Sequence, residues 1–233
     1  MKFVIFGDIH GRYIWKNIVK KNVGSHFIFL GDYTDPYKSE KIDEEQSLEN
    51  LQEIIDFKND NSNKVTLLIG NHDAQYFYPN LFGTNAMSKD FLMETMDLYY
   101  YNKNIFDFAY QKGDYLFTHA GVSNQWFNQY RGILNGFGLK EDLTNLGDVL
   151  NAVGNSKYLK IFSDVSSLRG GHEENGSPIW ADIKEVEYDN LDGIHQICGH
   201  NKVYDIVTYG DDKTSITFCD CLWRQIKALT INI

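Results

Sequence analysis

Three short apolar runs, each followed by a glycine and then an acidic or amide residue, constrain the fold of this chain more than any other feature. The runs are Lys2–Phe6 before Gly7-Asp8, Phe27–Leu30 before Gly31-Asp32, and Val65–Ile69 before Gly70-Asn71. Runs of this length, bounded by turn residues, are typical of buried β-strands. Between them, Tyr13–Val23 and Gln46–Phe57 repeat apolar residues at helical spacing. The order β-α-β-α-β predicts a parallel sheet with helical crossovers.

The second half of the chain predicts further strands and fewer helices. A strand over Tyr115–Thr118 leads to His119, and a helix is predicted over Phe91–Asn102. The segment from Ser123 to Leu168 is mixed, with a helix expected near Glu141–Val153. A second block of strands is predicted over His195–Cys198, Val203–Tyr209, Ser215–Phe218 and Ile226–Ile231. Because no repeat or linker interrupts the chain, we predict a single domain over residues 1–233.

Charge and cysteine usage limit the possible partners and location. The formal net charge is -10, from 32 acidic and 22 basic residues, and such a field repels nucleic acid and anionic membrane surfaces. We therefore expect binding to neither. The three cysteines have no metal-finger spacing, and their odd number argues against a disulfide framework. The first apolar run is too short for a signal peptide or a membrane span. These features predict a cytoplasmic protein.

Polar side chains that can bind metals follow several of the predicted strands. They are Asp8, His10, Asp32, Asp35, Asn71, His72, His119 and His200. In open α/β sheets, ligands gather at the carboxyl ends of the strands. Each segment alone is also typical of a turn, in which Asn and Asp bond the local backbone. Together, oxygen donors with a few imidazoles suit manganese, iron or zinc, so the combination predicts a metal site.

Five motifs carry a resemblance to a known family. They are GDIHG at 7–11, GDYTD at 31–35, GNHD at 70–73, HAG at 119–121 and GH at 199–200. In this order the chain resembles the calcineurin-like metallophosphoesterases, and most closely their phosphoprotein phosphatase branch with its bacterial and phage members. The segment SPIWAD at 177–182 is similar to a tryptophan-containing stretch of that branch. The resemblance implies an α/β fold, a four-layer α/β/β/α sandwich with a two-metal site at the sheet edge.

The resemblance also implies a role for each matching residue. Asp8 and His10 would bind the first of two divalent metal ions, and Asp32 would bridge both. The second metal would be completed by Asn71, His119 and His200. Manganese is the metal we favour, with iron or zinc as alternatives. A bridging carboxylate suits two cations about 3.5–4 Å apart, a spacing at which they can activate water together.

A histidine and an aspartate that are not metal ligands complete the implied site. His72 would be the general acid that protonates the leaving alkoxide, and Asp35 would orient it. The alternative for His72 is a hydrogen-bond donor without a part in proton transfer.

The sequence departs from the family at one position that matters for substrate binding. The arginine that usually follows GDxxD is replaced by Pro36. Arginine is suited to phosphate because its planar fork can bind two oxygens at once. Candidate replacements are Arg12, beside the first motif, and Arg169, in a glycine-rich loop. An exposed structural role is an equal alternative for each of them.

These observations predict a metal-dependent phosphatase that hydrolyses phosphomonoesters, on phosphoproteins or small molecules, by attack of a metal-bridging hydroxide. GNHD in place of GNHE is also similar to the symmetrical diadenosine tetraphosphatases, so hydrolysis of dinucleoside polyphosphates is the second hypothesis. A catalytically inactive phosphate-binding protein is the third. The presence of both His72 and Asp35, with every ligand position filled, argues against the third hypothesis.

Overall fold

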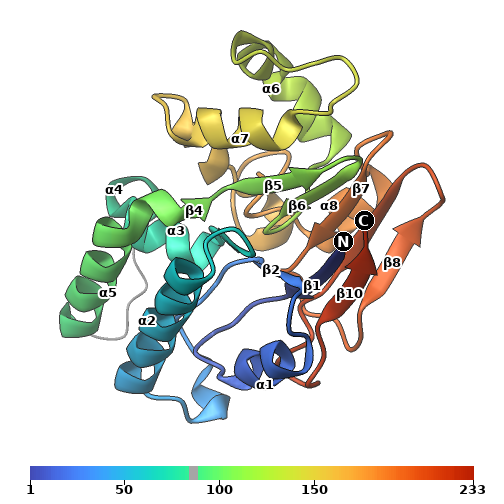
Figure 1. Ribbon diagram of the computed structural model, residues 1–233. Coiled ribbons are helices and arrows are strands. Elements are labelled where there is room, and N and C mark those ends of the chain that lie inside the picture. The colour runs from blue at the N-terminus through green and yellow to red at the C-terminus, as the bar shows by residue number, and fades with distance from the viewer. Residues whose placement is uncertain (84–88) are drawn as a thin grey trace. The chain divides into compact units, whose positions relative to one another are not determined.

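The computed structural model describes residues 1–83 and 89–233. The chain divides into two compact units, the first formed by Met1–Asp107 with Cys221–Ile233 and the second by Phe108–Asp220. Each unit is built on a five-stranded β-sheet with helices, as Figure 1 shows. The chain is therefore a mixed α/β protein with two sheets, as predicted. The single domain over residues 1–233 stays a prediction.

The sheet of the first unit has the order β10-β1-β2-β3-β4. Its strands are β1 (Lys2–Phe6), β2 (His26–Phe29), β3 (Val65–Leu68), β4 (Phe106–Asp107) and β10 (Leu229–Asn232). Strands β1 to β4 run parallel, which confirms the predicted parallel sheet. Strand β10, which overlaps the strand predicted over Ile226–Ile231, runs antiparallel beside β1 (Figure 1). By pairing there, β10 covers backbone groups that β1 would otherwise expose at a sheet edge.

Helices connect and follow the strands of the first unit. Helices α1 (Ile14–Lys21) and α2 (Glu44–Asp60) match the two predicted crossovers. Helix α2 begins at a capping box, in which the Asp43 carboxylate accepts from the Gln46 backbone N–H at 2.8 Å. After β3 come α3 (Asn71–Phe77), α4 (Pro79–Phe82) and α5 (Lys89–Asn102), and short 3-10 turns lie at Lys38–Glu40 and Lys103–Ile105.

Aromatic packing fixes the strands of the first unit against its helices. Phe6 and Phe29, on neighbouring strands, stack with ring centroids 4.6 Å apart. Trp15 of α1 meets Phe29 edge to face at 5.7 Å, and its indole N–H donates to Asn50 of α2 at 2.9 Å. Burying an apolar side chain of this size stabilises the fold by about 1.5–3 kcal/mol. Packing of this kind also fixes where each strand ends and its loop begins.

The sheet of the second unit has the order β5-β6-β7-β9-β8. Its strands are β5 (Ala109–Lys112), β6 (Tyr115–Thr118), β7 (His195–Cys198), β8 (Val207–Gly210) and β9 (Ser215–Phe218). Strands β6, β7 and β9 are parallel and confirm the predicted residues, and β5 and β8 are antiparallel edges. The strand predicted from Val203 begins only at Val207, because the Val203 N–H bonds the Asp220 carbonyl oxygen in a loop at 2.9 Å.

The helices of the second unit lie mostly in the segment for which the sequence pattern was mixed. They are α6 (Asn124–Gly136), α7 (Leu146–Gly154) and α8 (Ile183–Tyr188), with 3-10 turns at Leu159–Ser163 and Ser167–Arg169. Helix α7 overlaps the predicted helix. It packs closely on the chain before β5, where a Cβ at Gly154 would lie 2.2 Å from the Phe108 ring. Only glycine allows so close an approach.

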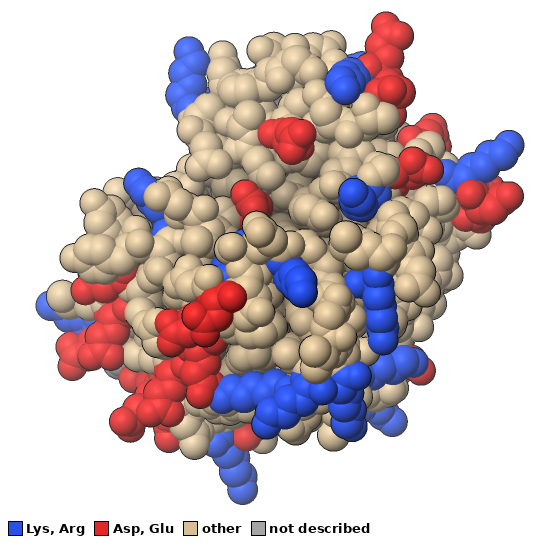
Figure 2. Space-filling view, viewed as in Figure 1, with Lys and Arg blue, Asp and Glu red and all other residues tan. Residues whose placement is uncertain are grey.

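Charge is unevenly distributed over the surface of the first unit. Figure 2 shows acidic side chains gathered over α2 and α5 and basic side chains over α1. The exposed carboxylates of these two helices include Glu45, Glu49, Glu53, Asp90, Glu94 and Asp97. Because salt screens exposed charge, the net charge of -10 does not by itself exclude an anionic substrate. Within the described ranges, no helix has both the length and the apolar character needed to cross a membrane.

Candidate metal centre

Three parallel strands of the first unit end in the loops that carry predicted metal ligands. Asp8 follows β1, Asp32 lies beyond β2 and Asn71 lies beyond β3, and all three are buried. Backbone N–H groups of Ile9 and His10 donate to the Asp32 carbonyl oxygen at 3.0 and 2.7 Å. These bonds join the first two loops at the carboxyl edge of the sheet, where ligands of α/β proteins gather.

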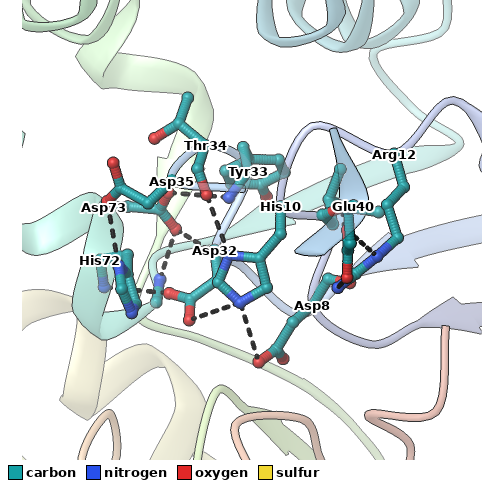
Figure 3. Close-up of polar contacts among 12 residues, drawn as sticks. Asp8, His10, Arg12, Asp32, Tyr33, Thr34, Asp35, Glu40, His72 and Asp73 are labelled. Carbon is teal, nitrogen blue, oxygen red and sulfur yellow. Dashed lines mark hydrogen bonds and ion pairs between the residues drawn. The ribbon is translucent and has the colours of Figure 1, made fainter. Parts of the chain in front are cut away.

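His10 lies between two carboxylates, as Figure 3 shows. Its Nε2 atom is 3.8 Å from Oδ2 of Asp8 and 3.8 Å from Oδ2 of Asp32. Its Nδ1 atom lies 2.9 Å from the Thr34 carbonyl oxygen, which can only accept, so Nδ1 carries the proton. Burial lowers the pKa of His10 to about 3. The ring is therefore neutral, and Nε2 presents a lone pair toward the two carboxylates.

This arrangement fits a divalent cation. The buried Nε2 of His10 has no hydrogen-bond partner within the described part of the chain, although buried polar atoms normally have one. Ligand atoms of Asp8, His10 and Asp32 all lie within 4.8 Å of one another. Two carboxylates at such a spacing repel each other unless positive charge lies between them. Carboxylates with a neutral imidazole are a donor set that suits manganese, iron or zinc.

The loops of this cluster hold an uncommon backbone conformation. His10, Asp32 and Asp35 have φ angles of 43°, 53° and 60°, in the left-handed region that favours glycine. Such residues cost of order 1–3 kcal/mol each and are found mostly at functional sites. Other contacts must stabilise the loops in this form.

Asp73 supplies such contacts to the loop that carries Asp32. Its carboxylate accepts from the backbone N–H groups of Asp32 at 2.7 Å, Tyr33 at 3.0 Å and Gly70 at 2.8 Å. It also accepts from the Tyr99 hydroxyl at 2.5 Å. Burial and the neighbouring Asp32 raise the pKa of Asp73 to about 6. Four donors on one fully buried carboxylate offset the cost of its burial and fix the position of Asp32.

His72 lies in the first turn of α3, directly after Asn71. Its Nδ1 is 2.9 Å from Oδ2 of Asp35, and its backbone N–H donates to Oδ1 of Asp32 at 3.0 Å. Burial acts to lower the pKa of His72, but Asp32 and the bond to Asp35 raise it to about 9. A cation bound to Asp32 would oppose the attraction between Asp32 and the His72 ring, and would therefore lower this pKa. The ring is 29% exposed, so part of it is accessible from solvent.

His119 and His200 form a pair in the second unit. His119 follows β6 and His200 lies beyond β7, and their ring centroids are 5.0 Å apart. The Gly199 N–H donates to the His119 carbonyl oxygen at 2.8 Å, which joins the two loops. Trp180, in the SPIWAD segment, meets the His200 ring edge to face at 5.9 Å. The second unit therefore brings two of the predicted ligands together.

The two candidate phosphate-binding arginines have different surroundings. Arg12 forms a two-pronged pair with Glu40, through Nε to Oε2 at 2.9 Å and Nη2 to Oε1 at 2.6 Å, and its Nη1 donates to the Asp8 carbonyl oxygen at 3.0 Å. The Nε of Arg169 lies 2.9 Å from Oδ2 of Asp182, and its Nη2 bonds the side chain of Asn201. Arg169 is therefore tied to the loop that carries His200 and pairs with one carboxylate oxygen, whereas the fork of Arg12 is held by both oxygens of Glu40.

Several residues of the site were not predicted. Asp73 lies within the GNHD motif at 70–73, but the sequence predicts no role for it. Glu40, Tyr76 and Tyr99 belong to no motif, and only the folded structure relates them to the predicted residues. Their partners are Arg12, Asp35 and Asp73.

Comparison with known proteins relates the chain to one family. The family model described as calcineurin-like phosphoesterase matches residues 1–220. No curated protein matches the chain.

Solved structures of phosphatases resemble the chain in fold. A cold-active protein-tyrosine phosphatase of a psychrophile, Shewanella, is 16% identical over 95% of this chain and 71% of that chain, with a TM-score of 0.52. A point mutant of a cold-active protein tyrosine phosphatase gives the same identity and coverage with a TM-score of 0.55. A protein serine/threonine phosphatase from Saccharomyces cerevisiae is 15% identical over 94% of this chain and 67% of that chain, with a TM-score of 0.49. At these identities the first two similarities support the fold alone.

Proposed function

The chain belongs to the calcineurin-like phosphoesterase family, and on that premise we propose that it is a metal-dependent phosphatase acting on phosphomonoesters of proteins or small molecules. The observation that carries the proposal is the neutral His10 ring, whose Nε2 faces the carboxylates of Asp8 and Asp32. Hydrolysis of a phosphate ester requires positive charge at the phosphoryl oxygens and a proton for the leaving group. The cluster suits the first requirement, and His72 suits the second.

We propose that two divalent cations are bound, with manganese favoured and iron or zinc as alternatives. Asp8 and His10 would hold the first cation and Asp32 both. The second would be completed by Asn71, His119 and His200. When bound, the cations would polarise a phosphoryl oxygen and lower the pKa of an attacking water. The donor types and the family membership support this assignment.

His72 would give its proton to the leaving oxygen. Since the Asp35 carboxylate accepts a bond from Nδ1, the Nε2 atom is the one that can face a substrate. The bond to the Asp35 carboxylate raises the pKa of His72 and so favours the protonated ring that a general acid requires. Asp35 would orient the ring and stabilise its charge.

Arg169 is the arginine that we favour for phosphate binding, because the two oxygens of Glu40 hold both Nε and Nη2 of Arg12, whereas Arg169 pairs with one oxygen of Asp182 and bonds Asn201, next to His200 in the chain. We expect Arg169→Ala to raise KM or lower the rate by an amount worth about 1.5–3 kcal/mol, the range for hydrogen bonds to charged groups. Arg169→Lys should recover only part of this loss, since lysine keeps the charge but not the fork. Steady-state kinetics on the best substrate, with metal content measured in parallel, tests the prediction.

Arg12→Ala is the matched comparison for that experiment. We expect it to lower thermal stability through the loss of the Glu40 pair and of the bond to the Asp8 carbonyl oxygen. Unchanged kinetic constants in both variants would show that neither arginine binds the substrate phosphate.

A dinucleoside polyphosphate hydrolase is the second candidate, since GNHD at 70–73 carries Asp73 where the phosphoprotein phosphatases carry glutamate. A panel of p-nitrophenyl phosphate, phosphopeptides, cyclic nucleotides and diadenosine tetraphosphate, each with manganese, iron or zinc, separates the candidates. We expect hydrolysis of the first two. Cleavage of diadenosine tetraphosphate alone would favour the second candidate, and metal binding without any hydrolysis would indicate a phosphate-binding protein.

We also propose that the protein is cytoplasmic. Its partner would be a phosphorylated substrate, and not nucleic acid or a membrane. The net charge of -10 and the three buried cysteines support them. Fractionation of cells that express the chain tests the location.

A further inference from the structure

The hydroxyl of Tyr76 is bonded to the carboxylate that orients His72. It donates to Oδ1 of Asp35 at 2.5 Å, while Nδ1 of His72 lies 2.9 Å from Oδ2 of the same carboxylate. One donor therefore meets each oxygen of Asp35. Of these three residues, the sequence motifs predict a role only for the histidine and the aspartate.

Both donors come from one helix. His72 and Tyr76 are four positions apart in α3 (Asn71–Phe77), so their side chains lie on the same face, one turn from each other. Asp35 comes from the loop after β2, where its φ of 60° is in the left-handed region. Two side chains of α3 thus hold a carboxylate whose own backbone conformation is costly.

Packing holds the Tyr76 ring in place. The residue is 3% exposed, its ring stacks on Tyr99 at 5.9 Å, and it meets Phe91 edge to face at 6.2 Å. Both neighbours belong to α5 (Lys89–Asn102). Burial and the adjacent Asp35 raise the pKa of Tyr76, so the hydroxyl stays protonated and acts as a hydrogen-bond donor. The direction of this donor is set by packing from a second helix.

We propose that Tyr76 is a positioning residue for proton transfer, which keeps the Asp35 carboxylate in the plane that aligns His72; this inference rests on the proposed function. The reason is torsional. The terminal torsion of aspartate is broad, so a carboxylate with a single donor can turn. With a donor on each oxygen, the carboxylate plane is fixed and Nε2 of His72 is held toward the leaving group. Supporting contacts of this kind keep catalytic groups in productive geometry.

The variant Tyr76→Phe tests the proposal, because it removes the hydroxyl and keeps the packed ring. With the manganese-loaded protein, we expect kcat on an alkyl phosphate to fall about tenfold, part of the 10²–10⁴-fold that a positioned acid contributes. On p-nitrophenyl phosphate, whose leaving group needs little protonation, the change should be below about twofold. KM and metal content should not change. In a His72→Asn background, Tyr76→Phe should have no further effect on the alkyl ester.

Tyr130→Phe is the matched control. It removes a hydroxyl that donates to Oδ2 of Asp164 at 2.6 Å, a tyrosine–aspartate bond of the second unit. We expect it to lower stability while leaving the ratio of alkyl to aryl rates at the wild-type value. A second readout needs no turnover: in the metal-free protein, NMR should show faster exchange of the His72 Nδ1 proton in Tyr76→Phe than in the wild type.

The outcomes separate the inference from the proposed function. If His72→Asn is selective for alkyl esters but Tyr76→Phe lowers both ester rates equally or neither, the inference is wrong and the phosphatase assignment stands. If the wild-type protein hydrolyses no ester, the assignment fails. The exchange of the Nδ1 proton then decides whether Tyr76 positions the ring, and an unchanged rate of exchange overturns the inference.

Discussion

Asp32→Asn is expected to lower both the bound metal and the rate. Oδ1 of Asp32 accepts from the His72 N–H, whereas Oδ2 lies 3.8 Å from the unprotonated Nε2 of His10 and is available to a cation. An amide keeps this shape but loses the negative charge that would bind two cations. Loss of an outer partner of a metal ligand already costs 10–100-fold in affinity, so we expect a loss of at least about 100-fold here. Equilibrium dialysis against manganese, followed by metal analysis, measures it.

Thermal unfolding gives a second measurement of the same prediction. A metal that binds only the folded state stabilises it by about 2.7 kcal/mol when its concentration is 100 times Kd. We expect the wild-type melting temperature to rise with manganese and that of Asp32→Asn to rise much less. Without metal the variant should be no less stable, because it removes the repulsion between Asp8 and Asp32.

Asp43→Asn is the control for the loss of one carboxylate. Asparagine is as good an N-cap as aspartate, so α2 keeps its start and only the charge is lost. This variant should bind metal and turn over like the wild type. Two bound metals and a full rate in Asp32→Asn would show that Asp32 is not the bridging ligand.

The strands that carry the first three loops can be predicted because buried parallel strands are short continuous apolar runs. Other elements have no such signal. Strand β4 has only two residues. Strand β5 has the sequence AYQK, in which apolar and polar residues do not alternate. Helix α6 contains three asparagines and two glycines, so its local preference is weak. Burial of Trp126 and Phe127 stabilises it instead, and that depends on tertiary contacts.

The candidate ligands can be predicted from sequence because their residue types carry the chemistry. The network that supports them cannot. Tyr76 and Tyr99 are indistinguishable from packing aromatics in the sequence, and their carboxylate partners are 41 and 26 positions away. The pair of Arg12 with Glu40 spans 28 positions. Helix α3 is too short to show a periodic pattern, so the pairing of its residues with one carboxylate is visible only in the folded chain.

His72→Asn is expected to leave the metals bound and to lower kcat on alkyl phosphates by about 10²–10⁴-fold, the contribution of a positioned general acid. Asparagine keeps the backbone N–H that bonds Asp32, so the ligand loop should not move. It cannot donate a proton to an alkoxide. Aryl esters should lose much less, since their leaving groups depart without full protonation.

The pH dependence supplies an independent test, because only the protonated ring can act as an acid. The pKa of His72 is raised to about 9 in the metal-free protein, so the wild-type rate on alkyl esters should fall with rising pH as the ring loses its proton. Bound cations oppose the attraction of Asp32, and they should move this limb to lower pH. The variant should lack the limb.

His172→Asn, at an exposed histidine, is the control and should change neither the rate nor the profile. If His72→Asn lowers alkyl and aryl rates equally and keeps the basic limb, then His72 positions the substrate instead of protonating its leaving group. The Asp35 carboxylate would then orient His72 as a hydrogen-bond donor to the substrate. The proton for the alkoxide would have to come from water.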